Sequence, residues 1–160
     1  TQSHWFTLVV EHMLKGIKMN KFSDRSLKRL EGVHPLLVDV VHKAMQMQVM
    51  DFSVVEGVRS LDRQKELFSQ GASKTLKSKH LIQSDGYGHA VDLYPYPINM
   101  KRVIKGDAKE IYRFGVLNGV IQGIANYMKV DIINGADWDG DGETLDHTFF
   151  DAPHYQLVLR

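Results

Sequence analysis

The sequence predicts a small single domain of the α+β class, in which helices pack on one face of a mostly antiparallel sheet. Three observations support this prediction. Apolar residues recur at helical spacing across residues 36–45 and 107–128, which indicates two amphipathic helices. Short segments at 51–56, 90–94, 130–134 and 154–159 have the composition or alternation of strands. The chain of 160 residues is long enough for one domain with its own core.

The composition is that of an ordinary globular protein. Hydrophobic residues make up 43% of the chain and charged residues 24%, with a net charge of +1. This charge implies no strong field toward nucleic acid, and no apolar run approaches the roughly 18 residues of a membrane span. The absence of Cys excludes disulfides and thiolate metal ligands. We expect a monomer that neither binds nucleic acid nor inserts into a membrane.

Residues 1–18 do not fit the pattern of the rest of the chain. The apolar run from Trp5 to Val10 is short, and Glu11 and His12 follow it directly. A signal peptide needs a basic start, then about 7 to 15 apolar residues and a small-residue cleavage site. We therefore expect no signal peptide, a leader or tag-derived segment at 1–18, and the domain itself at 19–160. The alternative is an authentic N-terminal helix that packs on the domain.

Two helices are predicted at the start of the domain. Residues 23–26 offer N-caps for a helix that continues through Leu30. His34-Pro35 begins a second helix, because proline fits the first turn. This second helix has an apolar face, and the methionines at and after its end are expected to fill the core: Met45, Met47 and Met50.

A strand at 51–56, a helix at 61–69 and a long loop come next. Arg59 follows the strand and is well placed to point into a cleft, although a surface ion pair is the alternative. Residues 71–88 are polar and basic, without periodicity. Loops of this length in a compact domain are usually functional or mobile.

The longest predicted helix follows the strand at 90–94. Asp107 is its expected N-cap, and the helix runs to about Met128. Three glycines four residues apart predict close packing of this helix against the sheet: Gly115, Gly119 and Gly123. Its buried face is expected to contain Ile111, Phe114, Leu117, Ile121, Ile124 and Ala125.

An acidic segment at 137–143 precedes the last predicted strand, with a loop predicted at 146–153. It matches the first half of an EF-hand loop, D-x-D-x-D-G, but Thr148 stands where that loop needs a bidentate Glu. A calcium site of another shape would draw on Asp137, Asp139 and Asp141, with Asp146 helping. The alternative is an acidic turn that only orders the following strand.

Two histidines and two aspartates are the candidates for catalysis. A catalytic zinc takes three protein ligands from His and Asp or Glu, and it keeps one position open for water. His80, Asp92 and His154 would supply these ligands. Asp151, three residues before the last ligand, would take the proton of that water. These residues are far apart in the sequence, so the fold has to bring them together.

The local patterns around these residues resemble a known family. Ser-x-His at 78–80, Gly-x-Ala-x-Asp at 88–92 and Asp-x-x-His at 151–154 are similar to the zinc peptidases that cleave bacterial cell-wall peptides. Within that family, the L-alanyl-D-glutamate endopeptidases used as phage endolysins match best. The resemblance runs from about Phe22 to Leu157 and takes in further segments at 55–60, 71–75 and 135–138.

One loop departs from the family pattern His-x-x-Gly-x-Ala-x-Asp. Residues 81–87 lengthen the connection between His80 and Asp92, and His89 lies nearer to Asp92 in sequence. We assign the ligand role to His80, because it has the Ser-x-His context. His89 is the alternative ligand.

The resemblance implies a zinc site on the sheet and its loops. It also implies that Arg59 lies over the scissile carbonyl, where a fixed guanidinium stabilises the oxyanion. Ser73 and Ser78 are expected to hydrogen-bond the substrate or the groups around the metal. The lysines of the same loop would meet the carboxylates of an anionic cell-wall peptide, and a solvated loop is the alternative for each of them: Lys74, Lys77 and Lys79.

The expected function is hydrolysis of the L-Ala–D-Glu bond in peptidoglycan stem peptides, with zinc as cofactor. As a phage-type endolysin, the protein would stay in the host cytoplasm until it is released to the cell wall. One alternative is a D-Ala-D-Ala carboxypeptidase of cell-wall precursors. Another is a non-catalytic, zinc-containing module that binds the cell wall, although such a module would need neither Asp151 nor Arg59.

Overall fold

The computed structural model describes residues 19–146, 148 and 150–159. The leader predicted at 1–18 lies outside the described residues, and so does His147. The helices are α2 (Asp24–Leu30), α3 (Pro35–Gln46), α4 (Leu61–Ser69), α5 (Met100–Ile104) and α6 (Ala108–Met128). The strands are β1 (Phe52–Glu56), β2 (Ala90–Pro95), β3 (Ile132–Gly135) and β4 (Asp151–Leu157).

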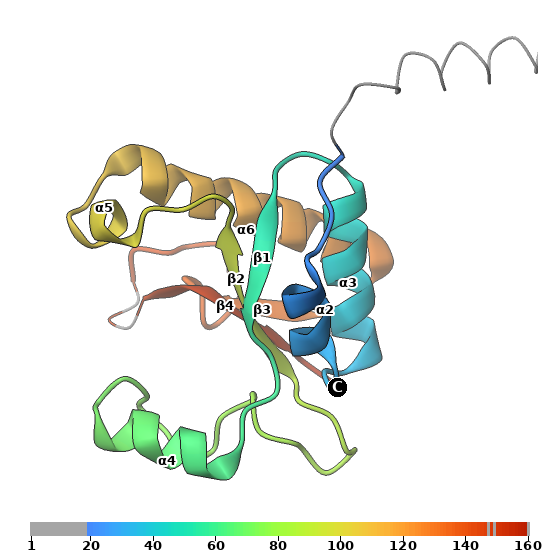
Figure 1. The fold of residues 1–160 in the computed structure, drawn as a ribbon, viewed down its shortest axis with the longest axis vertical. Helices are drawn as coiled ribbons and strands as arrows, with labels where there is room; N and C mark the ends of the chain where they lie inside the picture. The colour runs from blue at the N-terminus through green and yellow to red at the C-terminus, as the bar shows by residue number, and fades with distance from the viewer. Residues whose placement is uncertain (1–18, 147, 149, 160) are drawn as a thin grey trace, which may run out of the picture.

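The strands form a four-stranded sheet in the order β1-β2-β4-β3. All neighbouring strands are antiparallel. Helices α3 and α6 cover one face of the sheet, and their apolar side chains form the core with those of the strands (Figure 1). This arrangement confirms the predicted α+β class. None of the described helices combines the length and the apolar character needed to cross a bilayer.

Helix boundaries follow the polar residues that precede them. Ser23, Ser60 and Asp107 each accept a hydrogen bond from a backbone N–H in the first turn of α2, α4 and α6. His34 does the same for α3 through Nδ1. The predicted helices at 61–69 and 107–128 are therefore confirmed almost to the residue, and so is the predicted start of the second helix at Pro35.

Two predictions about α6 are wrong. A Cβ atom at Gly115, Gly119 or Gly123 would meet no heavy atom within 4 Å, so the glycine row faces open space and not the sheet. Ile111 is 43% exposed. The buried residues of the helix run from Phe114 to Ala125, as predicted, and the glycines lie on another side of the same helix.

Two further features differ from the predictions made from the sequence. Met47 is 52% exposed because it follows the last residue of α3, where the chain turns away from the core. Helix α5 was not predicted, and Asn99 caps its start. A helix of five residues carries too little periodicity to be found from sequence.

The last strand begins earlier than predicted. Asp151, Ala152 and Pro153 belong to β4, although the sequence predicted a loop there. The amide of Asn134 donates hydrogen bonds to the carbonyl oxygens of Ala152 and His154, at 2.9 and 2.8 Å. These bonds hold β4 against β3 across an irregular register, where a proline without an N–H is tolerated.

Candidate active site

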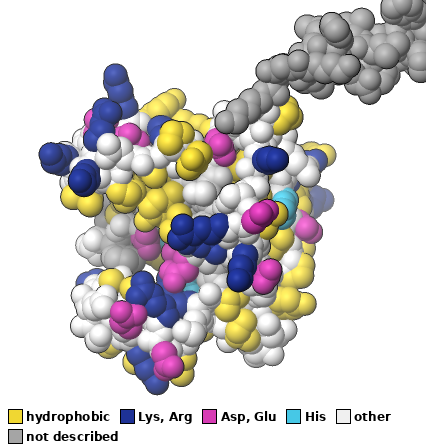
Figure 2. Space-filling model, in the orientation of Figure 1, with side chains coloured by type: hydrophobic (Ala, Val, Ile, Leu, Met, Phe, Trp, Pro, Cys, Tyr) yellow, Lys and Arg dark blue, Asp and Glu magenta, His cyan; other side chains and the backbone are white. Residues whose placement is uncertain are grey.

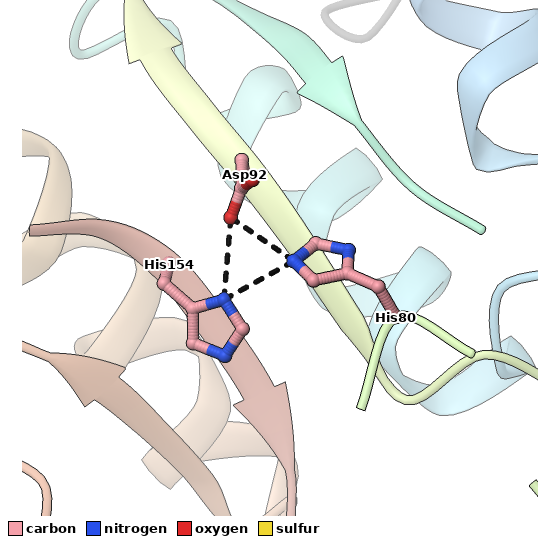
Figure 3. A group of neighbouring side chains, drawn as sticks. All are labelled: His80, Asp92 and His154. Carbon is pink, nitrogen blue, oxygen red and sulfur yellow. Dashed lines mark hydrogen bonds and ion pairs between the residues drawn. The ribbon is translucent and has the colours of Figure 1, made fainter. Parts of the chain in front are cut away.

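Three side chains that lie far apart in the sequence converge at one end of the sheet. His80 Nε2, Asp92 Oδ1 and His154 Nδ1 form a triangle in which each pair of atoms is 3.2 Å apart. The three side chains point toward one another from a loop, from β2 and from β4 (Figure 3). Both imidazoles are buried.

The register of the sheet accounts for two members of this group. Asp92 and His154 are direct partners across the antiparallel β2–β4 pair, so their side chains lie side by side on the same face. His80 reaches the pair from the loop that follows α4. The backbone N–H of Arg59 donates to the carbonyl oxygen of His80 at 2.9 Å, which ties this loop to the end of β1.

The partners of each imidazole leave one nitrogen facing the centre of the group. The carbonyl oxygen of Gly57 lies 2.7 Å from His80 Nδ1 and can only accept, so Nδ1 carries the hydrogen and Nε2 presents a lone pair. Gln156 Oε1 lies 3.2 Å from Nε2 of His154, which assigns the hydrogen of that ring in the same way and leaves Nδ1 facing inward.

The charges of the group depend on each other. Burial raises the pKa of Asp92, but the imidazoles of His154 and His80 beside its carboxylate outweigh this effect and hold the pKa well below its usual range. Burial lowers the pKa of His154, and the adjacent carboxylate of Asp92 reverses the sign, so the net shift is upward. Asp92 is therefore an anion that favours a cation between the two imidazoles.

This geometry fits a metal ion. Two imidazole lone pairs and a carboxylate oxygen converge, and three acceptors at this distance need a cation between them. Ligand atoms about 2.0–2.1 Å from a tetrahedral zinc lie roughly 3.3 Å from one another, close to the 3.2 Å observed here. The three residues thus form a group that could hold a metal ion and that borders a cleft.

Asp151 borders the same cleft, which has a volume of about 340 Å³. Burial and the negative charge of Asp92 raise the pKa of its carboxyl, and the neighbouring His154, His80 and Arg59 offset only part of this shift. Its position depends on Gly135, which pairs with Asp151 across β3 and β4. A Cβ atom at Gly135 would lie 2.3 Å from the carbonyl oxygen of Asp151, so only glycine allows this approach.

Arg59 borders the cleft, and only 8% of its side chain is exposed. Its Nη2 pairs with Glu56 and lies 3.8 Å from Asp92 Oδ2, and its Nη1 donates to Gln64 Oε1 at 2.7 Å. Glu56 is in turn the cross-strand partner of Asp92. The row Glu56, Asp92 and His154 therefore runs across three strands, with the Arg59 guanidinium beside it.

Gln64 supports the cleft from behind and was missed by the sequence analysis. Its side chain is fully buried, and its amide donates to Ser73 Oγ and to the carbonyl oxygen of Thr75 at 2.8 and 2.6 Å. It thereby joins Arg59 to the loop after α4. The signal in the sequence was weak: a polar residue three positions before Leu67, on the inward side of a short helix.

The two predicted serines both border the cleft, but their hydroxyls also have protein partners. Ser73 Oγ accepts from Gln64, and Ser78 Oγ accepts from the backbone N–H of His80 at 3.2 Å. Ser78 is buried. In this structure both serines therefore shape the loop that carries His80.

Comparison with known proteins identifies the family. The model of the phage L-alanyl-D-glutamate peptidase family matches residues 18–158. The chain belongs to this family. A relative is the L-alanyl-D-glutamate peptidase of Escherichia phage T5, which is 28% identical over 144 residues, covering 86% of this chain and 98% of the relative.

A solved structure supports the same family assignment. The L-Ala D-Glu endopeptidase ChiX of Serratia marcescens is 29% identical and superposes with a TM-score of 0.64. The alignment covers 91% of this chain and 95% of ChiX. The chain is therefore a peptidase by family, with the convergent His, Asp and His residues in its cleft.

In this family member the lengthened loop at 81–87 folds back on the domain. His89 Nε2 lies 2.7 Å from Asp85 Oδ2, and the ring of His34 packs edge-on against His89. His89, the alternative ligand to His80 in the sequence analysis, is therefore paired with Asp85. The structure places His80, and not His89, beside Asp92 and His154.

The acidic segment forms a second carboxylate group. One oxygen from each of Asp137, Asp139 and Asp141 lies within 4.8 Å of the others, and Asp139 and Asp141 are exposed. Asp137 also accepts hydrogen bonds from the backbone N–H groups of Gly140 and Gly142, at 2.9 and 3.0 Å. The geometry is that of a turn with carboxylates close together. It is compatible both with a calcium site and with an acidic turn that only orders the following strand.

Proposed function

We propose that this peptidase is a phage-type endolysin that hydrolyses the L-Ala–D-Glu bond of peptidoglycan stem peptides with zinc as cofactor. The observation that supports it most strongly is the triangle of His80, Asp92 and His154, with an aspartate of raised pKa in the same cleft. The choice of the L-Ala–D-Glu bond rests on the names of the phage T5 and Serratia relatives. Zinc is favoured because a His₂Asp set with an open position is typical of its catalytic sites.

Each residue of the cleft has a chemical role in this proposal. When bound, zinc would supply Lewis acidity that lowers the pKa of water and polarises the scissile carbonyl. Asp151 would take the proton of the attacking water and return it to the leaving amine nitrogen. Its raised pKa suits both steps, because an aspartate of ordinary pKa would hold a proton too weakly to deliver it. Arg59 would face the negative charge that develops on the carbonyl oxygen.

We further propose that residues 19–160 are the catalytic domain and residues 1–18 a leader or tag-derived segment. The family match from residue 18 onward supports this division. We also propose that the protein acts as a monomer and stays in the host cytoplasm until lysis, as expected for a relative of a phage peptidase.

Digestion of purified peptidoglycan tests the proposed bond. We expect mass analysis of the products to reveal new L-Ala carboxyl ends and new D-Glu amino ends. Release of free D-Ala would instead identify the carboxypeptidase alternative. Binding to peptidoglycan without new termini, measured with zinc-loaded protein, would leave only the non-catalytic module.

A calcium site at the acidic segment is a separate proposal, supported by the proximity of its three carboxylates. Titration calorimetry of the zinc-loaded protein with calcium is expected to show uptake of one ion. The double variant Asp137→Ala/Asp139→Ala should abolish that uptake and any rise in melting temperature that calcium causes. Absence of heat in the wild type would leave the segment as an acidic turn.

A further inference from the structure

The cleft around Asp151 has two sides of different chemistry. On one side, the loop after α4 brings Lys74, Lys77 and Lys79 to the cleft that contains Arg59. On the other side, a groove of about 400 Å³ lies between α5, the first turns of α6 and the start of β4. Asp151 borders both cavities, so the proposed catalytic base lies between them.

The second cavity is mainly apolar. Its lining includes Met100, Val103, Ile111, Phe114, Ala136 and Phe150. Ile111, which the sequence placed in the core, belongs to this groove. In space-filling view, hydrophobic side chains gather below α5 and along α6, whereas the α4 end of the molecule is covered mainly by charged and polar groups (Figure 2).

The lysine side is held in place by backbone hydrogen bonds. The carbonyl oxygen of Leu67, in α4, accepts from Ala72 and Ser73, at 2.9 and 3.1 Å. The carbonyl oxygen of Lys79 accepts from His89 at 2.7 Å. Together with the Gln64 bonds to Ser73 and Thr75, these contacts fix the positions from which the lysine side chains extend.

The two residues joined by an L-Ala–D-Glu bond also differ in charge, as the two sides of the cleft do. D-Glu supplies the amine of this bond and has two carboxyl groups, of which only one can continue the peptide. The other carboxyl remains as a free anion close to the scissile nitrogen, unless it is amidated. The L-Ala half carries a methyl group and continues, through an amide, to the uncharged sugar of the glycan.

We propose that the stem peptide crosses this cleft in one direction, with its free D-Glu carboxylate at Lys74, Lys77 and Lys79 and its L-Ala and attached sugar in the apolar groove beyond Asp151. This inference rests on the proposed function. The opposite direction would place the carboxylate in a groove lined mainly by apolar side chains and by no lysine or arginine, where desolvation opposes it. The three lysines are therefore specificity-determining residues for a free carboxylate over an amide.

Two synthetic stem peptides that differ only in a carboxylate or a carboxamide at D-Glu test the lysine side. We expect kcat/KM of the wild type to be about tenfold higher for the carboxylate, as for one charge-assisted hydrogen bond in an open cleft. The variant Lys74→Gln/Lys77→Gln/Lys79→Gln should cleave both peptides equally. A matched control, Lys28→Gln/Lys43→Gln/Lys129→Gln, removes the same charge from exposed positions outside both cavities and should keep the preference.

The apolar side is tested in the same experiment with peptides that carry or lack the muramoyl sugar on L-Ala. Gly115 lines the groove, and a Cβ atom there would meet no neighbouring heavy atom within 4 Å, so we expect the side chain of Gly115→Leu to extend into the groove. We expect a wild-type preference of about tenfold for the sugar-bearing peptide, the scale of one well-filled apolar pocket, and its loss in Gly115→Leu. Gly123→Leu, equally open but outside the groove, is the control.

The outcomes separate this inference from the proposed function. Cleavage at L-Ala–D-Glu without either preference, or preferences that survive the lysine and Gly115 variants, would reject the direction and leave the activity standing. A Gly115→Leu effect confined to peptides lengthened on the D-Glu side would indicate the reverse direction. Failure of the wild type to cleave any of these peptides would reject both.

Discussion

Replacing His80 with Ala is expected to remove the bound metal and all measurable hydrolysis of peptidoglycan. His80 Nε2 supplies one corner of the triangle, and the remaining aspartate and histidine would offer only two ligands. Removing a mere outer-shell partner of a metal ligand typically lowers metal affinity or activity by about 10–100-fold, so the loss of a ligand should exceed this range. Metal content per chain, measured by elemental mass spectrometry, and activity on the same sample give the result.

His89→Ala is the matched control for this prediction. His89 is also a buried histidine beside the same loop, but its ring pairs with Asp85. We expect His89→Ala to lower the melting temperature while it retains the metal. If His80→Ala kept full occupancy and His89→Ala lost it, the ligand assignment would be wrong.

Asp151→Asn is expected to lower kcat by about 10²–10⁴-fold, the usual contribution of a general base. Asparagine keeps the size of the side chain but cannot accept the proton. Metal content should stay at the wild-type level, because no ligand has changed. Hydrolysis of defined stem peptides and metal content, measured on one preparation, test both parts of the prediction.

The melting temperature distinguishes this role from a structural one. Burial and Asp92 raise the pKa of Asp151 in the folded protein. A raised pKa means that ionisation of this carboxyl destabilises the fold as the pH rises through the folded-state value. The neutral Asn avoids this cost. At pH 7 the metal-free Asp151→Asn variant should therefore have a melting temperature equal to or above that of the metal-free wild type. A lower melting temperature with activity within about threefold of wild type, far short of a lost general base, would remove Asp151 from the mechanism.

Much of the local structure was predictable because the signals for it are local. The caps at Ser23 and Asp107 and the proline at residue 35 act on the first turn of their own helices, and those helices begin where the caps predict. The same holds for the ligand candidates. Their residue types and short motifs identified His80, Asp92 and His154 before any distance between them was known.

The direction in which a side chain faces, and the residue with which it pairs, were not predictable in this way. The glycine row of α6 is a regular pattern in sequence, yet which neighbour it faces depends on how the whole helix rests on the sheet. The start of β4 at Asp151 depends on Asn134, an amide about twenty residues earlier in the chain whose bonds to Ala152 and His154 exist only in the folded state. Gln64 became significant only because its partners, Arg59, Ser73 and Thr75, surround it in the fold.

The sequence by itself determined which side chains are available for the proposed chemistry, because the identity of an imidazole, a carboxylate or a guanidinium is independent of folding. Only the tertiary structure decided how they act together. Cross-strand pairing placed Asp92 beside His154, and the bond from Asp85 to His89 left His80 as the third member of the group. Distances of 3.2 Å between ligand atoms and the raised pKa of Asp151 arise from burial and proximity, which no sequence pattern states.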